Sequence, residues 1–209
     1  MPRRTIALRA GEYYHLYNRG VNRQKVFFNR ENYLFFLRRV RKYLLEQDQT
    51  SEVSETSEIL PGVLPGCEVI AYCLMPNHYH FVIRPLHNEL SHRMQLLGIS
   101  YTKAINKQQR RVGPLFQGQF QAVHVDRDEY LLHLSRYLHL NPVLAGLVKK
   151  PEDWPFSSYN DYLGLRQGTL PKPDVILSQF ENRAAYERFV KAYLPRDKDK
   201  IAHLLFDED

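Results

Sequence analysis

The stretch EVIAYCLMPNHYHFVIR, residues 68–84, contains two strand-like runs rich in apolar and aromatic residues. The first run is Glu68–Leu74 and the second is His78–Arg84. Between them stands Met75-Pro76-Asn77, and proline followed by asparagine is typical of a turn. The stretch therefore predicts a β-hairpin, around which the rest of the fold is arranged.

Toward the N-terminus, the aromatic-rich run Tyr13–Asn18 predicts a further strand, followed by the polar turn Arg19-Gly20-Val21-Asn22. A helix is expected next, because Asn29 suits an N-cap and apolar residues then recur at helical spacing until about Glu46. Gln47–Gly66 is dominated by Ser, Thr, Glu, Pro and Gly without apolar periodicity, so we expect a flexible surface loop there.

Toward the C-terminus, helical spacing of apolar residues predicts a helix over Leu90–Lys107, and alternation predicts a strand over Phe120–Val125. Another helix follows, with either Asp126 or Asp128 as its N-cap. We expect this helix to end at Asn141-Pro142, because a residue that precedes proline disfavours the helical region.

The expected order is strand, helix, strand, strand, helix, strand and then a third helix, the ferredoxin-like β-α-β-β-α-β pattern of the α+β class with an appended helix. This pattern implies an antiparallel sheet with helices on one face. We expect one domain over residues 1–150, with the insertion 47–66, and a C-terminal extension, residues 151–209, packed on it. In the extension we expect Trp154, Phe156 and Tyr159 to pack over the core, a helix near Asn182–Tyr193, and a mobile end.

Composition indicates a soluble globular protein with one substantial core. The chain has 209 residues, 44% of them hydrophobic and 25% charged. No apolar stretch approaches the roughly 18 residues of a membrane span, and the start lacks the apolar run of a secretory signal, so we expect a cytoplasmic protein without a membrane partner. Cys67 and Cys73 are too far apart along an extended strand to form a disulfide, and we expect both to be small core residues.

Positive charge is concentrated in two regions of the sequence. The net charge is +6, no acidic residue occurs from Leu90 to Val125, and the first thirty residues hold seven basic residues against Glu12 alone. Such one-sign stretches favour phosphate backbones. The alternative is that a basic surface serves solubility only.

His78 and His80 are two residues apart on a predicted strand, so both imidazoles point to one face while Tyr79 and Phe81 point to the other. Two neighbouring imidazoles can bind one metal ion. The alternative is a pair of surface or hydrogen-bonded histidines without a metal.

The motif Cys73-Leu74-Met75-Pro76-Asn77-His78-Tyr79-His80 resembles the His-hydrophobic-His signature of the HUH single-tyrosine transposases. More closely, the chain resembles the REP-associated tyrosine transposases, relatives of the enzymes that move the smallest bacterial insertion sequences. The matching blocks, in the family's order over about residues 13–163, are Asn18-Arg19-Gly20, residues 113–120 (GPLFQGQF), residues 136–143 (RYLHLNPV) and residues 154–159 (WPFSSY).

This resemblance implies a metal-dependent endonuclease and strand transferase that acts on single-stranded or hairpin DNA, such as repetitive extragenic palindromes. A tyrosine hydroxyl attacks a DNA phosphate and gives a covalent 5′-phosphotyrosine and a free 3′-hydroxyl. Because a phenol with a pKa near 10 is a poor nucleophile at neutral pH, charge at the phosphate and leaving oxygen must be stabilised. The resemblance implies Mg²⁺ or Mn²⁺ in this role, with His78 and His80 as ligands.

Spacing alone leaves the nucleophile open, because a tyrosine followed four residues later by a polar side chain occurs several times. The candidate pairs are Tyr137 with Asn141, Tyr43 with Gln47, Tyr14 with Asn18, and Tyr193 with Asp197. The resemblance selects Tyr137, within the RYLH motif. The alternative is that Tyr137 is an ordinary core aromatic, although Tyr130 is the better core candidate by position.

Asn141 is the candidate third metal ligand, although insertion-sequence relatives commonly carry the longer glutamine there. Its alternative role is to end the helix beside Pro142. His124 and His139 are candidates for auxiliary roles, with a structural role as the alternative. The candidate DNA contacts are Arg19, Arg93, Lys103, Lys107, Arg110 and Gln117.

Two other classes of function remain open on the sequence. One is a domesticated protein that binds DNA or RNA and has lost cleavage, although His78, His80 and Tyr137 are all present. The other is a zinc-binding structural or regulatory protein, against which stands the lack of a Cys-x-x-Cys pair. The resemblance leaves both a monomer and a homodimer open, and DNA as the partner implies association with the nucleoid.

Overall fold

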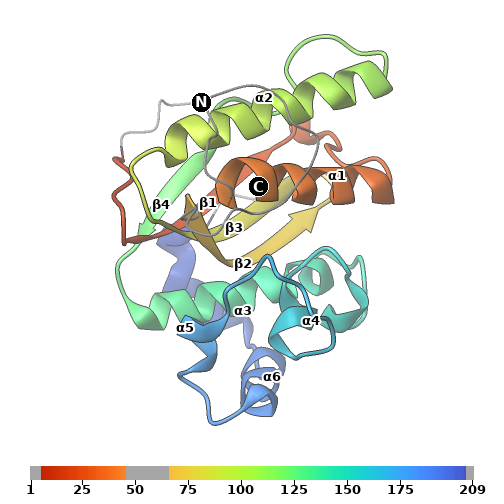
Figure 1. Cartoon of the computed structure of the whole chain (residues 1–209). Coiled ribbons are helices and arrows are strands. Elements are labelled where there is room, and N and C mark those ends of the chain that lie inside the picture. The colour runs from red at the N-terminus through yellow and green to blue at the C-terminus, as the bar shows by residue number, and fades with distance from the viewer. Residues whose placement is uncertain (1–5, 46–65, 206–209) are drawn as a thin grey trace.

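The computed structural model describes residues 6–45 and 66–205 (Figure 1). The main elements are β1 (Tyr13–Arg19), α1 (Arg30–Val40), β2 (Cys67–Met75), β3 (His78–Pro85), α2 (Leu90–Gln108), β4 (Gln121–Val125), α3 (Asp128–Leu144), α4 (Tyr159–Tyr162), α5 (Asp174–Leu177) and α6 (Arg183–Lys191). Short turns of helix are η1 (Val21–Arg23), η2 (Arg41–Leu45), η3 (Pro151–Asp153) and η4 (Pro195–Leu204). No described helix has the length and apolar character needed to cross a membrane.

The four strands form one antiparallel sheet in the order β2-β3-β1-β4. This order and the alternation of strands and helices confirm the predicted α+β, ferredoxin-like fold class. The predicted hairpin is β2 and β3, and β1 lies beside β3 with Tyr17 opposite His80 and Arg19 opposite His78. The sheet register therefore brings the start of the chain to the histidine pair.

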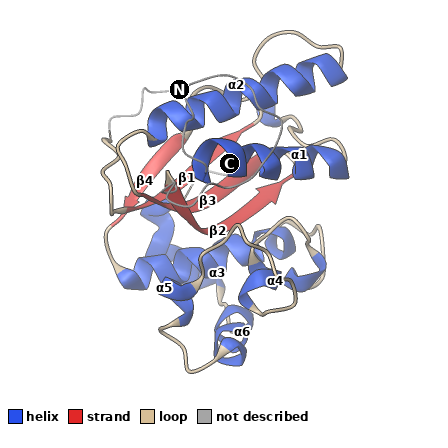
Figure 2. Cartoon of the chain, viewed as in Figure 1, coloured by secondary structure: helices blue, strands red, loops and turns tan. Residues whose placement is uncertain are grey.

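As predicted, the two helices of the ferredoxin-like pattern, α1 and α2, cover one face of the sheet, and the appended helix α3 covers the other (Figures 1 and 2). We call the face under α1 and α2 the apolar face; its strand residues include Tyr14, Leu16, Tyr72, Leu74, Tyr79, Phe81 and Ile83. We call the face under α3 the histidine face; its strand residues include His15, Tyr17, Cys73, His80 and Val82. The two free cysteines are buried on opposite faces, because a bulge between Val69 and Ala71 shifts the alternation of β2.

Helix α1 begins as predicted, because the Asn29 side chain accepts a hydrogen bond from the backbone N–H of Asn32. It is followed by the π-helical turn η2. Most of the predicted loop over Gln47–Gly66 lies outside the described residues, which resume at Gly66.

Two predictions about the ends of α3 were wrong. Its N-cap is Arg127, which makes no side-chain capping bond, so neither Asp126 nor Asp128 caps it. The helix also continues through Pro142 to Leu144. The chain turns away from the helix at Gly146, whose φ of +69° is left-handed. There the N–H of Leu147 donates to the carbonyl of Pro142, and the N–H of Gly146 donates to the carbonyl of Val143. This glycine-terminated turn satisfies the last carbonyls, whereas proline only disfavours the preceding helical residue.

The segment after residue 150 lies against edge strand β2. Leu74 N–H donates to the carbonyl of Phe156, Ser158 N–H donates to Tyr72, and the Trp154 indole donates to Leu74. These bonds cover β2, an edge that would otherwise present unpaired backbone groups. Helix α6 forms where the sequence predicts a helix, with Asn182 as its N-cap. The domain boundary at residue 150 stays a prediction.

The expectation of a mobile end was wrong for residues 195–204. These residues form η4, in which Ile201 and Leu204 are buried on the histidine face. The two side chains are three residues apart, which matches the repeat of a 3-10 helix. An ion pair of 3.0 Å between Arg136 on α3 and Asp197 also holds η4 in place. The many charged residues of this segment led to the prediction of a mobile end, although Ile201 and Leu204 among them are buried.

Candidate active site

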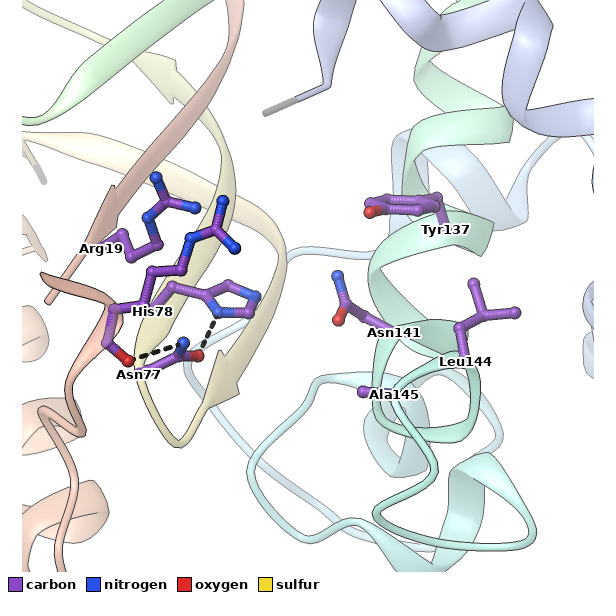
Figure 3. A pocket seen from close by; sticks show the side chains of 8 residues that line it. Arg19, Asn77, His78, Tyr137, Asn141, Leu144 and Ala145 are labelled. Atoms are coloured by element: carbon purple, nitrogen blue, oxygen red, sulfur yellow. Dashed lines mark hydrogen bonds between the residues drawn. The ribbon is translucent and has the colours of Figure 1, made fainter. Parts of the chain in front are cut away.

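A cavity of about 220 Å³ opens between the sheet and α3 (Figure 3). It is lined by Arg19, Arg23, Asn77, His78, Tyr137, Asn141, Leu144 and Ala145. Arg19 and His78 come from β1 and β3 and face Tyr137 and Asn141, which project from α3. The fold thus places four residues that the sequence singled out around one space.

His78 is the first residue of β3, immediately after the hairpin turn. Its Nδ1 lies 2.7 Å from Oδ1 of Asn77, whose amide in turn donates to the carbonyl of Arg23. Burial, and then the positive charge of Arg19, lowers the pKa of His78 to about 4, so the ring is neutral at pH 7. Its other nitrogen, Nε2, is buried and has no hydrogen-bond partner.

His80 lies deeper, with 1% of its surface exposed. Its Nδ1 lies 2.9 Å from Nε2 of His15, and its ring centroid lies 4.8 Å from that of His78. Burial, followed by the neighbouring His78 and His15, holds the pKa of His80 well below its usual value. Nε2 of His80, like that of His78, is buried without a partner.

The residues present fit a divalent metal ion. Two neutral imidazoles each keep one ring nitrogen without a protein partner, and the Asn141 side-chain nitrogen is likewise buried and unpartnered. Buried polar atoms are normally satisfied, so three such atoms on one side of the sheet suggest a ligand. Rotation of the Asn141 amide would offer its oxygen instead. The described residues contain no group of three or more His, Cys, Asp and Glu side chains suited to a metal, so a third protein ligand would be of another type.

Tyr137 lies on the face of α3 that points to the histidines. Its ring centroid is 6.4 Å from that of His80, in an edge-to-face arrangement, and Asn141 follows one turn later on the same helix face. Tyr137 is 3% exposed, whereas Tyr130 is only partly buried and lies beside His203. The expectation that Tyr130 is the better core residue was therefore wrong.

The other candidate tyrosines lie elsewhere. Tyr14 belongs to the apolar face, where its hydroxyl contacts the backbone of Ala7 and Arg9. Tyr43 packs against the same face from η2. Tyr193 follows α6, beside Arg136. None of these three residues lines the cavity.

Arg19 is held at the cavity by the loop before β4. Its Nε donates to Oε1 of Gln117 at 3.2 Å, and the backbone N–H of Gln117 donates to the carbonyl of Arg19. Gln117, which the sequence suggested as a DNA contact, thus orients a cavity arginine. Asn18 ties the same loop by donating to the carbonyl of Gly118.

Arg93 does not suit the predicted role of a DNA contact. It is 2% exposed, pairs with Glu89 at 3.1 Å and donates to the carbonyl of Tyr43. The sequence shows Glu89 four residues before Arg93, but it does not show that Arg93 is buried against the carbonyl of Tyr43. Lys103, Lys107 and Arg110 are exposed on or just after α2, which covers the opposite face of the sheet from the cavity.

The two auxiliary histidines are held in structural contacts away from the cavity lining. Nε2 of His124, on β4, lies 2.9 Å from Oε2 of Glu12. His139 is buried between the hydroxyls of Tyr186 and Ser158, each at 2.7 Å.

Sequence reasoning missed three residues of this region: His15, Arg23 and Asn77. Asn77 stands within the quoted hairpin motif, and Arg23 follows the polar turn after β1, where its φ of +57° is left-handed. His15 shares strand parity with Tyr17 and Arg19, but only the pairing of β1 with β3 shows that it meets His80.

Comparison with known proteins points to one group. The family model described as "Transposase IS200 like" matches residues 34–141, a range that includes His78, His80, Tyr137 and Asn141. A Haemophilus influenzae protein named "Putative REP-associated tyrosine transposase" is 26% identical over an alignment of 135 residues. The match covers 58% of this chain and 74% of the relative. The structure titled "Structure of the REP associates tyrosine transposase bound to a REP hairpin" has a TM-score of 0.57 at 18% identity and covers 83% of this chain and 90% of the other. These findings confirm the resemblance drawn from the motifs.

Proposed function

Because this chain belongs to the IS200-like transposase family, we propose that it cleaves and rejoins single-stranded DNA beside a hairpin, with Tyr137 as nucleophile and a divalent metal at His78 and His80. The observation that carries the proposal is the cavity in which Tyr137 and Asn141 from α3 face Arg19 and His78 from the sheet. A tyrosine that served only the core would not be expected to share a cavity with the buried, unpartnered nitrogen of His78 and to lie with its ring 6.4 Å from that of His80.

The reaction follows from the groups around the cavity. The Tyr137 oxygen attacks a backbone phosphorus, a tyrosine–phosphorus bond forms, and the bond from phosphorus to the 3′ oxygen breaks. The phenol proton passes to solvent, and the leaving oxygen takes a proton to become a 3′-hydroxyl. Attack by a 3′-hydroxyl on the phosphotyrosine reverses these steps and rejoins DNA. The phosphodiester energy stays in the protein linkage, so no nucleotide triphosphate is consumed.

Charge stabilisation comes from both walls of the cavity. Arg19, oriented by Gln117, and Arg23 both line the cavity and would contact the phosphate oxygens. His78, His80 and the Asn141 amide would hold Mg²⁺ or Mn²⁺, with water and phosphate oxygens completing the sphere. When bound, such a cation polarises the phosphate and stabilises charge on the leaving oxygen.

We propose hairpin DNA as the substrate for two reasons. The solved structure that this chain resembles is bound to a REP hairpin, and Arg19 and Arg23 of this chain line the cavity. Either a monomer or a homodimer is compatible with this proposal. We further propose that the protein works in the cytoplasm at the nucleoid, where such DNA occurs.

The test is an adduct assay with end-labelled single-stranded hairpin DNA from the protein's own genomic neighbourhood and Mg²⁺ or Mn²⁺. Wild type should give a protein–DNA adduct that survives denaturation, and Tyr137→Phe and His78→Ala should not. Tyr130→Phe is the matched control, because this tyrosine lies on the same helix outside the cavity lining.

Adduct formation by Tyr137→Phe would reject the nucleophile. Equal adduct yield in the presence of a chelator would reject the metal. Tight hairpin binding without cleavage under any metal would favour the domesticated binding protein.

A further inference from the structure

His15 lies in the middle of β1 on the histidine face and is fully buried. It makes two contacts through its two ring nitrogens. Nδ1 lies 2.6 Å from the carbonyl oxygen of Leu204, and Nε2 lies 2.9 Å from Nδ1 of His80. His15 therefore stands between the C-terminal turn η4 and one of the two proposed metal ligands.

The positions of the protons in this chain of contacts follow from what each atom can do. A carbonyl oxygen only accepts, so Nδ1 of His15 carries a proton. A neutral imidazole has one protonated nitrogen, so Nε2 of His15 is an acceptor and Nδ1 of His80 must donate to it. The remaining nitrogen of His80, Nε2, then keeps its lone pair, and this is the nitrogen without a partner.

We infer that His15 is a positioning residue that fixes the tautomer and orientation of His80, so that Nε2 of His80 presents a lone pair to a divalent cation. The carbonyl of Leu204 fixes the tautomer of His15 in turn. The inference rests on the proposed function, because it assigns a purpose to a site that the proposal places at His78 and His80. Ligating histidines are commonly held in this way through their second nitrogen.

The contacts of His78 and His80 differ from those of a histidine with a purely structural role. His139 shows what a structural buried histidine looks like in this protein: both of its nitrogens have hydroxyl partners, at Tyr186 and Ser158. His80 has one nitrogen held at 2.9 Å and the other buried with none. His78 repeats this arrangement, with Asn77 as the holder.

The proposed ligands His78 and His80 differ in how far along the chain their hydrogen-bond partners lie. Asn77 is the residue next to His78, whereas His15 is 65 positions from His80 and Leu204 is 189 positions from His15. Correct presentation of His80 therefore depends on η4 being docked on α3, through contacts that include the pair of Arg136 and Asp197. The C-terminal turn thus acts on the proposed metal site although none of its residues lines the cavity.

The first test is nitrogen NMR of metal-free wild type labelled at histidine, near neutral pH. We expect His80 to be protonated at Nδ1 and unprotonated at Nε2, and His15 to be protonated at Nδ1. His80 protonated at Nε2 would overturn the inference. This readout needs no metal, no DNA and no variant.

The second test measures Mn²⁺ binding by electron paramagnetic resonance. His15→Phe keeps a ring but removes the acceptor, and should weaken Mn²⁺ binding by about 10- to 100-fold. His15→Gln offers an oxygen to His80 and should bind within about threefold of wild type. His124→Gln, a histidine on the neighbouring strand that pairs with Glu12 instead, should bind like wild type. Circular dichroism checks that each variant is folded.

The outcomes separate this inference from the proposed function. Wild-type affinity in folded His15→Phe would overturn the positioning role and leave the metal site standing. Failure of wild type to bind Mn²⁺, with or without hairpin DNA, would overturn the metal site and the purpose assigned to His15. Equal weakening in His15→Phe and His15→Gln would also count against the inference, because only the first lacks an acceptor.

Discussion

The two faces of the sheet differ in whether the buried polar atoms of their strands have hydrogen-bond partners. On the apolar face, the hydroxyl of Tyr101 donates to the carbonyl of Val26, and aromatic rings such as Phe36 fill the remaining space. On the histidine face, ring nitrogens of His78 and His80 are buried without partners. A buried unsatisfied polar group costs about 1–3 kcal/mol, so among the described strand residues this cost falls on the histidine face. This difference is the one expected if the apolar face serves folding and the histidine face carries the proposed binding site.

The largest effect should come from removing one hydroxyl on the histidine face. Tyr137→Phe should reduce DNA cleavage by at least about 1,000-fold, because the variant lacks the hydroxyl of the proposed nucleophile. The matched change on the apolar face, Tyr101→Phe, should lower the free energy of unfolding by about 1 kcal/mol and leave cleavage intact. Cleavage of labelled hairpin DNA and urea unfolding measure the two effects. Comparable loss of cleavage in both variants would remove the distinction between the faces.

A large truncation on the apolar face should affect stability above all. Phe36 is fully buried, and its ring packs against Phe27, Tyr79 and Tyr101. Phe36→Ala should lower the free energy of unfolding by about 3–5 kcal/mol, measured by urea denaturation. His78→Ala should change it by less than about 1 kcal/mol, because the variant also removes an unsatisfied nitrogen. A larger loss in His78→Ala than in Phe36→Ala would reverse the assignment of roles.

A smaller effect should come from the ion pair that holds η4 on the histidine face. Arg136 is 5% exposed and Asp197 15%, so Asp197→Asn should cost about 1–2 kcal/mol, less than for a fully buried pair. The pKa of Asp197 is held below its usual value by the backbone N–H of Leu194 and then by Arg136, with His133 also nearby. Its stabilising contribution is therefore complete above about pH 4 and is lost as the pH falls through the lower folded-state pKa.

Thermal unfolding of wild type and Asp197→Asn across pH 2–7 checks this sign. The difference between the two proteins should be constant near neutral pH and should shrink in acid. A difference that grows in acid would contradict the assignment.

The smallest effect should come from the basic residues outside the cavity. Lys103→Gln should weaken hairpin binding by less than about threefold and reduce the dependence of affinity on salt by about one counterion. Arg19→Gln, at the cavity, should reduce cleavage by about tenfold or more. Hairpin binding at several salt concentrations, together with cleavage assays, compares them. A larger loss of cleavage in Lys103→Gln would place the DNA path over α2 instead.

Much of the fold could be predicted from sequence, because its signals are local. Strand alternation around the hairpin, the Asn29 cap and the helical spacing of α2 each act within one element, and the structure confirms them. The end of α3 was missed because the rule for proline was weighed above Gly146, which satisfies the last carbonyls. Arg93 was misjudged because its partners, the side chain of Glu89 and the carbonyl of Tyr43, make a site for a buried charge that sequence reasoning did not identify.

The sequence by itself determined the order of elements, the pairing of His78 with His80 on one face of a strand, and the spacing of Tyr137 and Asn141 on one face of a helix. These are consequences of the backbone repeat within a single element. Only the tertiary structure decided that His78 on β3 and Tyr137 on α3 line one cavity, and that Gln117 orients Arg19 there. It also decided that His15 contacts both His80 and the carbonyl of Leu204. Those contacts join residues far apart in the chain, and they depend on sheet register and on how α3 and η4 dock, which no local repeat encodes.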